Sequence, residues 1–520
     1  MDKMSGRHLA MPSVSGRIKQ GPSELLDEEV LKPQFRYESA HLLSSYLAIE
    51  KVFAVEYVRM GLISTEQGNA ITAALRGMGP ASITAQADQN MSDIAFAIEQ
   101  YIEGQVPDLA SAWHVDRSRN DFQACAQLMS GRQQALYTVR ELMEFGRAAV
   151  DLARRTSHMP MPGYTHLQAA QVITPGFYFA AVVEQVVHSL QRLLTTYDGI
   201  NLCPLGGGAM AGQEISWDRE RMARLLGFRA PRPHALAAVA SRDWTLELAA
   251  ELALLGAPLS RFATDLMNWG GGAYGFIDLP DELSGISSAM PQKKNFPILE
   301  RIRGKSAHLV SCQLDMTIGQ RNTPYSNSVE VSKEAGAYLL TSFSSARSLL
   351  RLFTVVLERV EFREKHMREA CEREYLGGFT LANFLTLHER VPWRSSQVIA
   401  GRYIVAAIER GASPRQTDPD LLRHMAKDHG FDLCHPEQAL TQAFDVEANL
   451  RQKCTPGSVH PDAVEDLLNE SQNRLDALAT EWEQRGRSVD SALQLLDQVP
   501  MAGSKAPSGP RLYGEEGARS

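Results

Sequence analysis

Five long stretches of helical periodicity constrain the fold of this chain more than any other feature. Apolar residues recur at three- and four-residue spacing over roughly 120–156, 170–200 and 234–270. Two further stretches run from about 297 to 318 and from about 328 to 360. Strand-like alternation bounded by turns is scarce, so we predict a mainly α-helical architecture whose helix-end loops can converge.

Shorter helices are predicted on both sides of these stretches. One begins at about His41, and a second begins near Ser64, where Ser-Thr-Glu-Gln resembles a capping signal. Residues 371–490 have the pattern of several shorter helices. The polar segment up to about residue 22 and the low-complexity tail from about residue 500 are expected to be loosely ordered.

The overall composition argues against several classes of protein. The net charge is −8, so no basic bias points to nucleic acid or to an anionic membrane as a partner. The N-terminus lacks the apolar core of a secretory signal. The most apolar long segment, 244–269, carries four charged residues, which favours a buried helix over a membrane span. We therefore expect a soluble, cytoplasmic protein.

The six cysteines are widely scattered and have no paired spacing of the CxxC type. This pattern is not that of a zinc site or a disulfide framework. We expect reduced thiols, most of them buried.

Four polar or glycine-rich segments between the long helices are candidates for chemistry. They are Trp113–Asp121, Pro162–Gln168, Pro204–Gly212 and Asp281–Asn295. Loops carried on a rigid scaffold are common places for functional sites. The glycine run of the third segment lacks the spacing of a phosphate-binding loop, so close backbone approach is the better interpretation.

These segments carry a family resemblance. Gly285–Asn295 (GISSAMPQKKN) is similar to the signature loop of the fumarase/aspartase superfamily, and its PQKKN ending is most similar to argininosuccinate lyases. The runs HVDRSRND at 114–121, PGYTHLQ at 162–168 and PLGGGA at 204–209 resemble further family motifs, in the family's order. The resemblance covers roughly residues 30–480 and implies an all-α, fumarase/aspartase-like fold.

The resemblance also implies a domain organisation and an assembly. We expect an N-terminal helical domain (1–116), a central long-helix bundle domain with the signature loop (117–368), a small C-terminal helical domain (369–500) and a flexible tail (501–520). We further expect a homotetramer whose active sites each collect loops from three subunits. No metal or organic cofactor is implied.

The reaction that the resemblance implies is the release of fumarate from an N-substituted aspartate. Removing a proton next to a carboxylate gives a high-energy aci-carboxylate, which needs a nearby base and preorganised cationic and hydrogen-bonding groups. The family assigns the base to the position of Ser287, and Lys293 and His166 complete the candidate catalytic set. A free serine is a poor base and needs activation as an alkoxide by cations and backbone donors. The residues leave open whether His166 protonates the leaving nitrogen.

Other residues of the same segments are candidates for binding a small dicarboxylate substrate. A guanidinium between two neutral hydrogen-bonding side chains, as in Ser118-Arg119-Asn120, suits a carboxylate. The full set of predicted binding residues is Ser118, Arg119, Asn120, Thr165, Met290, Asn295, Tyr325, Glu330 and Lys333.

Several positions depart from the family's usual pattern. In the stretch 325–334, Glu330 stands where the family has Gln, and the charges around it are lost. Ala95 replaces a usual His, Phe296 a usual Pro and Asp116 a usual Gly. Groups expected to hold the fumarate half are thus retained, whereas groups expected to contact the leaving amine are changed.

This pattern favours a relative that acts on another N-succinyl amine or amino acid, such as ethylenediaminedisuccinate. In that hypothesis Lys333 pairs with a distal carboxylate and Glu330 with an ammonium. The alternatives are an argininosuccinate lyase of arginine biosynthesis, an inactive structural homologue of the lens-crystallin kind, and a helical scaffold. An adenylosuccinate lyase fits less well, because PGYTHLQ with PQKKN is the wrong variant for it.

Overall fold

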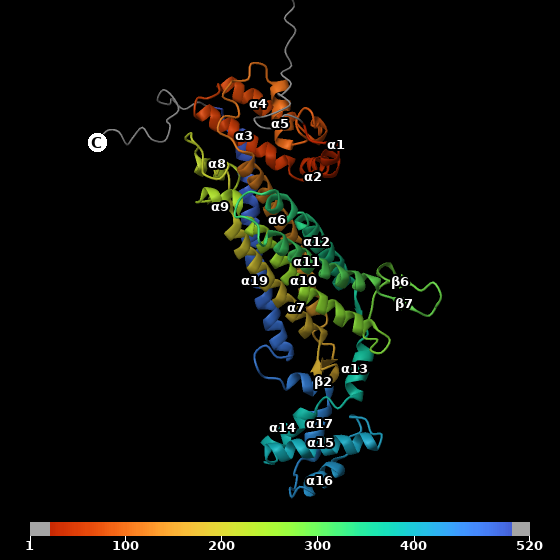
Figure 1. The fold of residues 1–520 in the computed structure, drawn as a ribbon. Helices are drawn as coiled ribbons and strands as arrows, with labels where there is room; N and C mark the ends of the chain where they lie inside the picture. The colour runs from red at the N-terminus through yellow and green to blue at the C-terminus, as the bar shows by residue number, and fades with distance from the viewer. Residues whose placement is uncertain (1–20, 502–520) are drawn as a thin grey trace, which may run out of the picture.

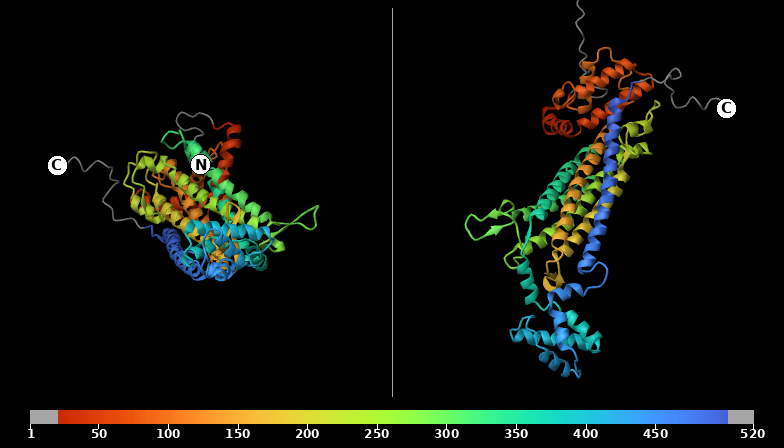
Figure 2. Two further views of the ribbon diagram at one scale, coloured as in Figure 1. Left: turned by 90° about the horizontal axis from the view of Figure 1, so that it is seen from below. Right: turned by 180° about the vertical axis from the view of Figure 1, so that it is seen from behind.

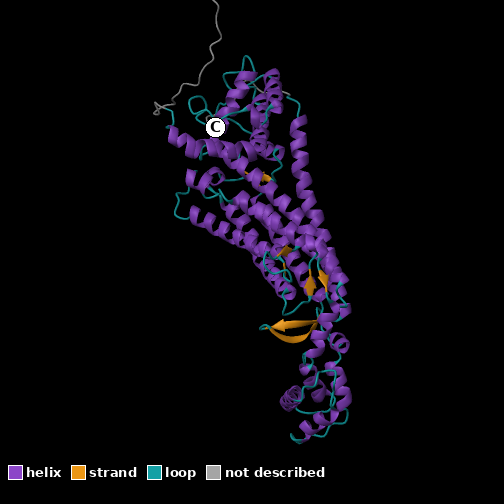
Figure 3. Cartoon of the chain, turned by 90° about the vertical axis from the view of Figure 1, so that its right-hand side faces the viewer, coloured by secondary structure: helices purple, strands orange, loops and turns teal. Residues whose placement is uncertain are grey.

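A bundle of long helices forms the centre of the molecule in the computed structural model, which describes residues 21–501 (Figure 1). The low-complexity ends predicted from the sequence fall almost entirely on residues 1–20 and 502–520, which lie outside the described residues. The fold is all-α, as predicted. The few strands form short two-stranded pairs (Figure 3).

The helices at the N-terminal end of the molecule precede the bundle. They are α1 (Glu24–Leu26), the π-helical turn η1 (Asp27–Leu31), α2 (Lys32–His41), α3 (Leu43–Arg59), α4 (Thr65–Gly77), the 3-10 turn η2 (Pro80–Ser82) and α5 (Ile94–Gln105). The predicted capping signal at Ser64 is confirmed: Ser64 Oγ accepts a hydrogen bond from Gln67 N (3.2 Å), and Gln67 Oε1 accepts one from Ser64 N (3.0 Å).

The bundle itself is built from long helices joined by short elements. The helices are α6 (Arg119–Arg155), α7 (Pro175–Ile200), α8 (Arg219–Leu225), α9 (Ala235–Ala240), α10 (Asp243–Gly270), α11 (Pro297–Gln320), the π-helical turn η4 (Glu330–Glu334) and α12 (Leu339–Arg359), with the 3-10 turn η3 (Asp281–Leu283). The strands are β1 (Met161–Thr165) with β2 (Gln168–Ile173), β3 (Leu202–Cys203) with β4 (Ala230–Pro231), β5 (Ile277–Asp278) with β8 (Glu361–Phe362), and β6 (Gly285–Ile286) with β7 (Lys294–Asn295). Of these four pairs, β3 with β4 is parallel and the other three are antiparallel.

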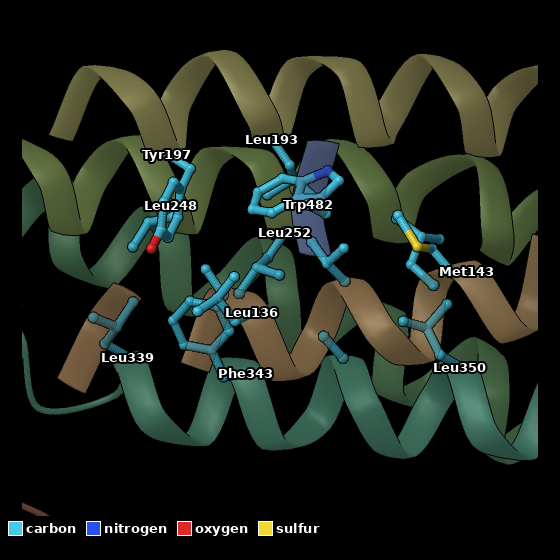
Figure 4. Packing of buried hydrophobic residues seen from close by; sticks show 14 of the residues in the cluster. Leu136, Met143, Leu193, Tyr197, Leu248, Leu252, Leu339, Phe343, Leu350 and Trp482 are labelled. Carbon is cyan, nitrogen blue, oxygen red and sulfur yellow. The ribbon is translucent and has the colours of Figure 1, made fainter. Parts of the chain in front are cut away.

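The bundle core is made by the apolar stripes of its long helices (Figure 4). Leu136 and Met143 of α6 face Phe343 and Leu350 of α12, and all four are buried. Each long helix buries such a stripe. Because close-packed interiors allow little displacement, the loops that connect these helices are held in fixed positions.

The C-terminal helices separate into two parts. Helices α14 (Gly378–Leu387), α15 (Trp393–Glu409), α16 (Pro419–Lys427) and α17 (Pro436–Phe444) share a core of their own. The remaining elements are α13 (Glu364–Arg373), α18 (Val446–Arg451) and α19 (Pro461–Gln498). Helix α19 runs back along the bundle (Figure 2), and its Leu475 and Trp482 belong to the main core. The range 369–500 proposed as one small domain therefore contains a helix that packs elsewhere.

Three of the predicted long stretches are interrupted. Residues 168–173 pair as β2 with β1, so α7 begins only at Pro175, behind the N-cap Thr174. The 234–270 stretch breaks at Ser241 and Arg242, where the Arg242 guanidinium donates to the carbonyls of Val239 and Ser241. The 328–360 stretch is regular α-helix only from Leu339. Helical periodicity alone does not reveal such breaks, because they depend on side-chain caps and strand pairing.

Two other sequence predictions concern membranes and thiols. Within residues 21–501, no helix is both long and apolar enough to span a bilayer. All six cysteines are free thiols; three are buried, Cys312 is half-buried, and Cys434 and Cys454 are exposed, so the prediction that most of them are buried holds for only half.

Candidate functional site

The N-terminal end of α6 presents three of the predicted binding residues. Ser118 caps this helix, because its Oγ accepts a hydrogen bond from Asn120 N (3.2 Å). Asn120 Nδ2 donates to Ala209 O (2.9 Å), and Asn120 Oδ1 accepts from Asn327 Nδ2 (2.8 Å). The glycine-rich loop and the 325–334 stretch thus hold the Asn120 side chain from two sides.

The two arginines of the 114–121 motif have different environments. The Arg117 side chain is only 7% exposed; it forms a two-pronged ion pair with Glu50 and lies over the Phe53 ring, with 4.2 Å from its guanidinium carbon to the ring centroid. Arg119 is open, with 59% of its side chain exposed, and Nη1 donates to Asp93 Oδ2 (2.9 Å). Of the two, Arg119 is the guanidinium available to a substrate carboxylate, and Arg117 is part of the scaffold.

Asp116 stands where the family has Gly, and its backbone shows why the family uses Gly there. Its φ is +59°, a left-handed conformation that disfavours most side chains. The Asp116 carboxylate accepts hydrogen bonds from Glu214 N, Ile215 N and Trp217 Nε1, at 3.0–3.1 Å. These bonds offset the strain and attach the 114–121 loop to residues 214–217.

The glycine run works by close backbone approach, as the sequence predicted. A Cβ on Gly208 would lie 2.4 Å from Gly212 O. Gly206 N and Gly208 N both donate to Asp121 Oδ2, at 2.9 and 3.0 Å. Burial raises the pKa of Asp121 to about 7, and these backbone donors offset part of the rise. Asp121 therefore joins the loop to α6, as does the neighbouring Asn120.

The 325–334 stretch lies against the same end of α6, but its residues are not equivalent. Tyr325 and Glu330 are exposed. Lys333 forms an ion pair with Glu38 of α2, whose side chain is 5% exposed. Burial raises the pKa of the Glu38 carboxyl, and the Lys333 ammonium offsets part of that rise. Glu38 was not among the residues predicted from the sequence, because it belongs to no family motif.

Thr165 and His166 lie at the turn of the β1–β2 hairpin, and both are exposed. His166 and Leu167 form a two-residue turn with φ of 53° and 61°, and Leu167 is 77% exposed. Hairpin turns of this kind normally use Asn-Gly, so a His-Leu pair carries backbone strain. Such strain is common at functional sites, because the turn then presents a chosen side chain outward.

The signature segment forms an arm that projects from the bundle (Figure 1). Its base is the β6–β7 pair, in which Gly285 is opposite Asn295. Ser287 is half-buried, and its Oγ accepts a hydrogen bond from Met290 N (3.1 Å). A backbone N–H that donates to this oxygen favours its alkoxide form. Asn295 Nδ2 donates to Ile286 O (3.4 Å) across the strand pair.

Two residues near the signature lysine anchor the arm. Lys294 Nζ lies 3.1 Å from Asp278 Oδ1 and 3.1 Å from Asp281 Oδ1. Lys293 has no ion-pair partner among the described residues and is exposed. Phe296, which replaces a family Pro, packs on α10 so closely that a Cβ on Gly270 would lie 2.6 Å from its ring. Lys294 and Phe296 therefore hold the arm's base, and Lys293 remains available.

A single chain does not bring together three groups of candidate residues: those at the start of α6, those of the β1–β2 hairpin and those of the β6–β7 arm. Arg119 begins α6 and the β1–β2 hairpin follows its other end, and a 37-residue helix is ~55 Å long. The arm precedes α11 and Tyr325 follows it, and a 24-residue helix is ~36 Å long. Figure 1 shows α6, β2 and the β6–β7 arm at separate places on the molecule. Any site that uses all three groups must be assembled from more than one chain.

Comparison with known proteins shows the family. The family described as Lyase matches residues 49–310, half of the chain. An argininosuccinate lyase from Aquifex aeolicus (strain VF5) is 31% identical over 360 residues, which cover 68% of this chain and 77% of that relative. The chain belongs to the argininosuccinate lyase family. This family lies within the fumarase/aspartase superfamily, so the protein is a fumarate-forming carbon–nitrogen lyase.

Other members of the argininosuccinate lyase family and its superfamily match most of the chain. Argininosuccinate lyase 1 from Shouchella clausii (strain KSM-K16) is 28% identical and covers 93% of this chain and 97% of its own length. The solved structure of EDDS lyase in complex with formate has a TM-score of 0.81 at 22% identity and covers 92% of this chain and 95% of its own. That structural likeness shows the shared fold of the superfamily.

Proposed function

We propose that the protein reversibly eliminates an amine from an N-substituted aspartate, with Ser287 as the base that removes the proton. The observation that carries this proposal is the half-buried Ser287, whose Oγ accepts a hydrogen bond from Met290 N on the same projecting arm as the exposed, unpaired Lys293. Both the N–H group and the ammonium stabilise an alkoxide, which is the form that can take a proton from carbon.

The other candidate residues have roles that follow from their chemistry. Lys293 and Asn295 stabilise the aci-carboxylate that forms when the proton leaves. Arg119, flanked by Ser118 and Asn120, binds a substrate carboxylate through its planar guanidinium. Thr165 and His166 contact the second carboxylate or the amine-bearing carbon, and Met290 closes over the substrate.

We further propose that the active protein is a homotetramer with shared sites. The separation of Arg119, His166 and Ser287 on one chain supports this arrangement, because each chain would contribute a different group to a given site. The outward side of α11 also carries exposed apolar residues at helical spacing, Val310, Leu314 and Ile318. Such a stripe is typical of a helix that packs against another subunit.

The favoured substrate is an aminocarboxylate other than argininosuccinate, such as ethylenediaminedisuccinate. Glu38 already neutralises Lys333, so the amine side of this site has little net positive charge. An amine leaving group that carries an additional protonated nitrogen is compatible with that balance, and both ethylenediaminedisuccinate and argininosuccinate release such an amine. The preference for the former rests on the altered 325–334 stretch. The alternative, argininosuccinate, is supported by the names of the relatives that match most of the chain.

The test is fumarate release, followed by ultraviolet absorbance, with argininosuccinate, ethylenediaminedisuccinate and a panel of N-substituted aspartates. The expected result is turnover that is selective for a non-argininosuccinate substrate and that is lost in Ser287→Ala. Strong selectivity for argininosuccinate would support the alternative. No fumarate from any N-substituted aspartate would instead favour an inactive structural homologue.

A further inference from the structure

Arg132 of α6 is a buried cation, 2% exposed, without an acidic partner among the described residues. Its Nη2 donates to Gly227 O (2.5 Å), and its guanidinium carbon lies 4.0 Å from the centroid of the Phe228 ring. Its Nε is buried and has no hydrogen-bond partner in residues 21–501. The Arg117 guanidinium, by contrast, pairs with Glu50. A carbonyl and a ring face offset only part of the cost of burying a charge, so an anion close to Arg132 would be stabilised.

A cavity of about 230 Å³ lies against Arg132, between the start of α3, the first half of α6 and the end of α19. It is several times larger than the ~30 Å³ that one water occupies in the liquid, so it has room for more than a single bridging water. Its described lining includes no residue of the signature arm, the β1–β2 hairpin or the 325–334 stretch. Along α6, Arg132 is ~20 Å from Arg119. The cavity therefore lies outside the groups of residues proposed for catalysis.

Part of the cavity lining consists of polar groups that suit an anion. No Asp or Glu is among its described residues, whereas Ser44, Ser45 and Ser130 line it with hydroxyl groups that can donate. Gln134 also lines the cavity, and its buried Oε1 has no hydrogen-bond partner in the described chain. The polar groups of Arg132 and Gln134 therefore lack part of their hydrogen bonding within residues 21–501. Buried polar groups normally complete it with protein, water or ligand atoms.

The rest of the lining is mainly apolar. It includes Leu136 of α6, Leu226 at the end of α8 and Leu493 of α19, and the first two of these leucines are buried. A strongly hydrated anion without an apolar part, such as phosphate, would lose water against these side chains without compensation. A carboxylate on a short carbon chain can place its charge near Arg132 and its apolar part on the leucines.

We infer that this cavity is a second binding site, for a small aliphatic carboxylate that pairs with the Arg132 guanidinium. The inference goes beyond the proposed lyase reaction and does not depend on it. A planar guanidinium suits a carboxylate, and the neighbouring hydroxyl groups add donors. Because the lining comes from α3, α6 and α19, a carboxylate bound there stabilises the folded arrangement of these three helices.

The experiment titrates the full-length protein with sodium acetate, propionate and butyrate by calorimetry, at an ionic strength kept constant with sodium chloride. Affinity is expected to rise by roughly fourfold with each added methylene, because each one is buried on the leucines. Sodium phosphate is the comparison anion and is expected to bind more weakly than butyrate.

Three arginine variants identify where the carboxylate binds. Arg132→Met should lower butyrate affinity by roughly tenfold or more, the effect of one charged hydrogen bond. Arg140→Met removes an exposed arginine two turns further along the same helix and should change little, so it is the matched control. Arg119→Met should keep the Arg132-dependent binding, because Arg119 belongs to the proposed substrate site.

A fourth variant covers the case in which Arg132→Met does not fold. Ser44 is exposed near the start of α3, so Ser44→Leu is tolerated there and narrows the cavity without touching Arg132. It should weaken butyrate binding more than acetate binding, because the longer chain needs more room. Circular dichroism checks the fold of each variant.

Several results would overturn the inference. They are the absence of saturable butyrate binding to the wild type, binding that survives Arg132→Met, and phosphate affinity at least equal to that of butyrate. Butyrate binding that Arg119→Met abolishes and Arg132→Met leaves unchanged would assign the carboxylate to the substrate site, with the same consequence.

Discussion

At the residue scale, neighbouring residues of one motif have opposite roles. Arg117 and Arg119 are two positions apart, yet one is enclosed by Glu50 and aromatic rings and the other faces solvent. Ser118 between them ends the loop and starts the helix. A motif therefore identifies a segment, and burial decides which of its side chains a substrate can reach.

Replacing each of these arginines should affect a different property. Arg119→Met is expected to lower kcat/KM by roughly 10- to 100-fold with little loss of stability, because it removes a charged hydrogen bond to the substrate. Arg117→Met should cost ~3 kcal/mol or more, because Glu50 is left buried without its partner. Urea denaturation and fumarate kinetics on both variants measure the two effects. Equal destabilisation by both substitutions would contradict the assignment.

Asp116 allows backbone strain to be separated from side-chain bonding. Asp116→Gly and Asp116→Ala both lose the bonds to residues 214–217, but only Gly relieves the φ of +59°. We expect the Ala variant to be less stable than the Gly variant by about 1 kcal/mol. Asp108, with a φ of 58°, is the matched control, and Asp108→Gly should be at least as stable as the wild type. Thermal unfolding of the four proteins provides the comparison.

At the element scale, α6 organises the site. Its N-terminus is joined to the glycine-rich loop by Asp121, and its far end precedes the β1–β2 hairpin. Because the helix is packed along its length against α7, α12 and α19, these positions cannot shift independently.

The raised pKa of the buried Asp121 carboxyl predicts that the stability of the fold depends on pH. Its pKa is about 7 in the folded protein, whereas an aspartate in the unfolded chain has its ordinary value of 3.8, so between these two pH values the folded state binds more protons than the unfolded state. Stability from this group should therefore fall as pH rises from about 4 to about 7, by on the order of a few kcal/mol. Asp121→Asn should flatten that part of the curve. Chemical denaturation across this pH range tests it, and an unchanged slope in the variant would exclude Asp121 as the cause.

At the scale of the whole molecule, the hairpin with His166 and the arm with Ser287 would reach one site from different chains, so two inactive variants should complement each other. His166→Ala and Ser287→Ala chains should each be nearly inactive alone. If they are dissociated, mixed in equal amounts and reassembled, about a quarter of the sites should receive an intact hairpin and an intact arm from different chains. Recovered fumarate release measures this fraction.

The control for this mixing experiment uses two lesions in the same arm. Ser287→Ala mixed with Lys293→Ala should recover nothing, because no arm in the mixture is intact. Recovery in the control, or none in the His166 and Ser287 mixture, would show that sites are not shared in the proposed way.

Local information in the sequence determined the helical class, the capping box at Ser64, the glycine-rich close approach and the family of the chain. These features depend on residues within a few turns of one another, so spacing and composition are enough to predict them. The β1–β2 hairpin was missed, because its residues lack clear alternation and its turn is His-Leu rather than Asn-Gly.

Only the tertiary structure decided which side chains meet. Lys333 pairs with Glu38, 295 positions earlier in the chain, and Asp121 holds a loop 85 positions later. No periodicity or motif encodes these partners, since they follow from which helices pack together and how far apart their ends lie. The same lengths of α6 and α11 separate the family's motifs on one chain, so a site that uses all of these motifs would require more than one chain.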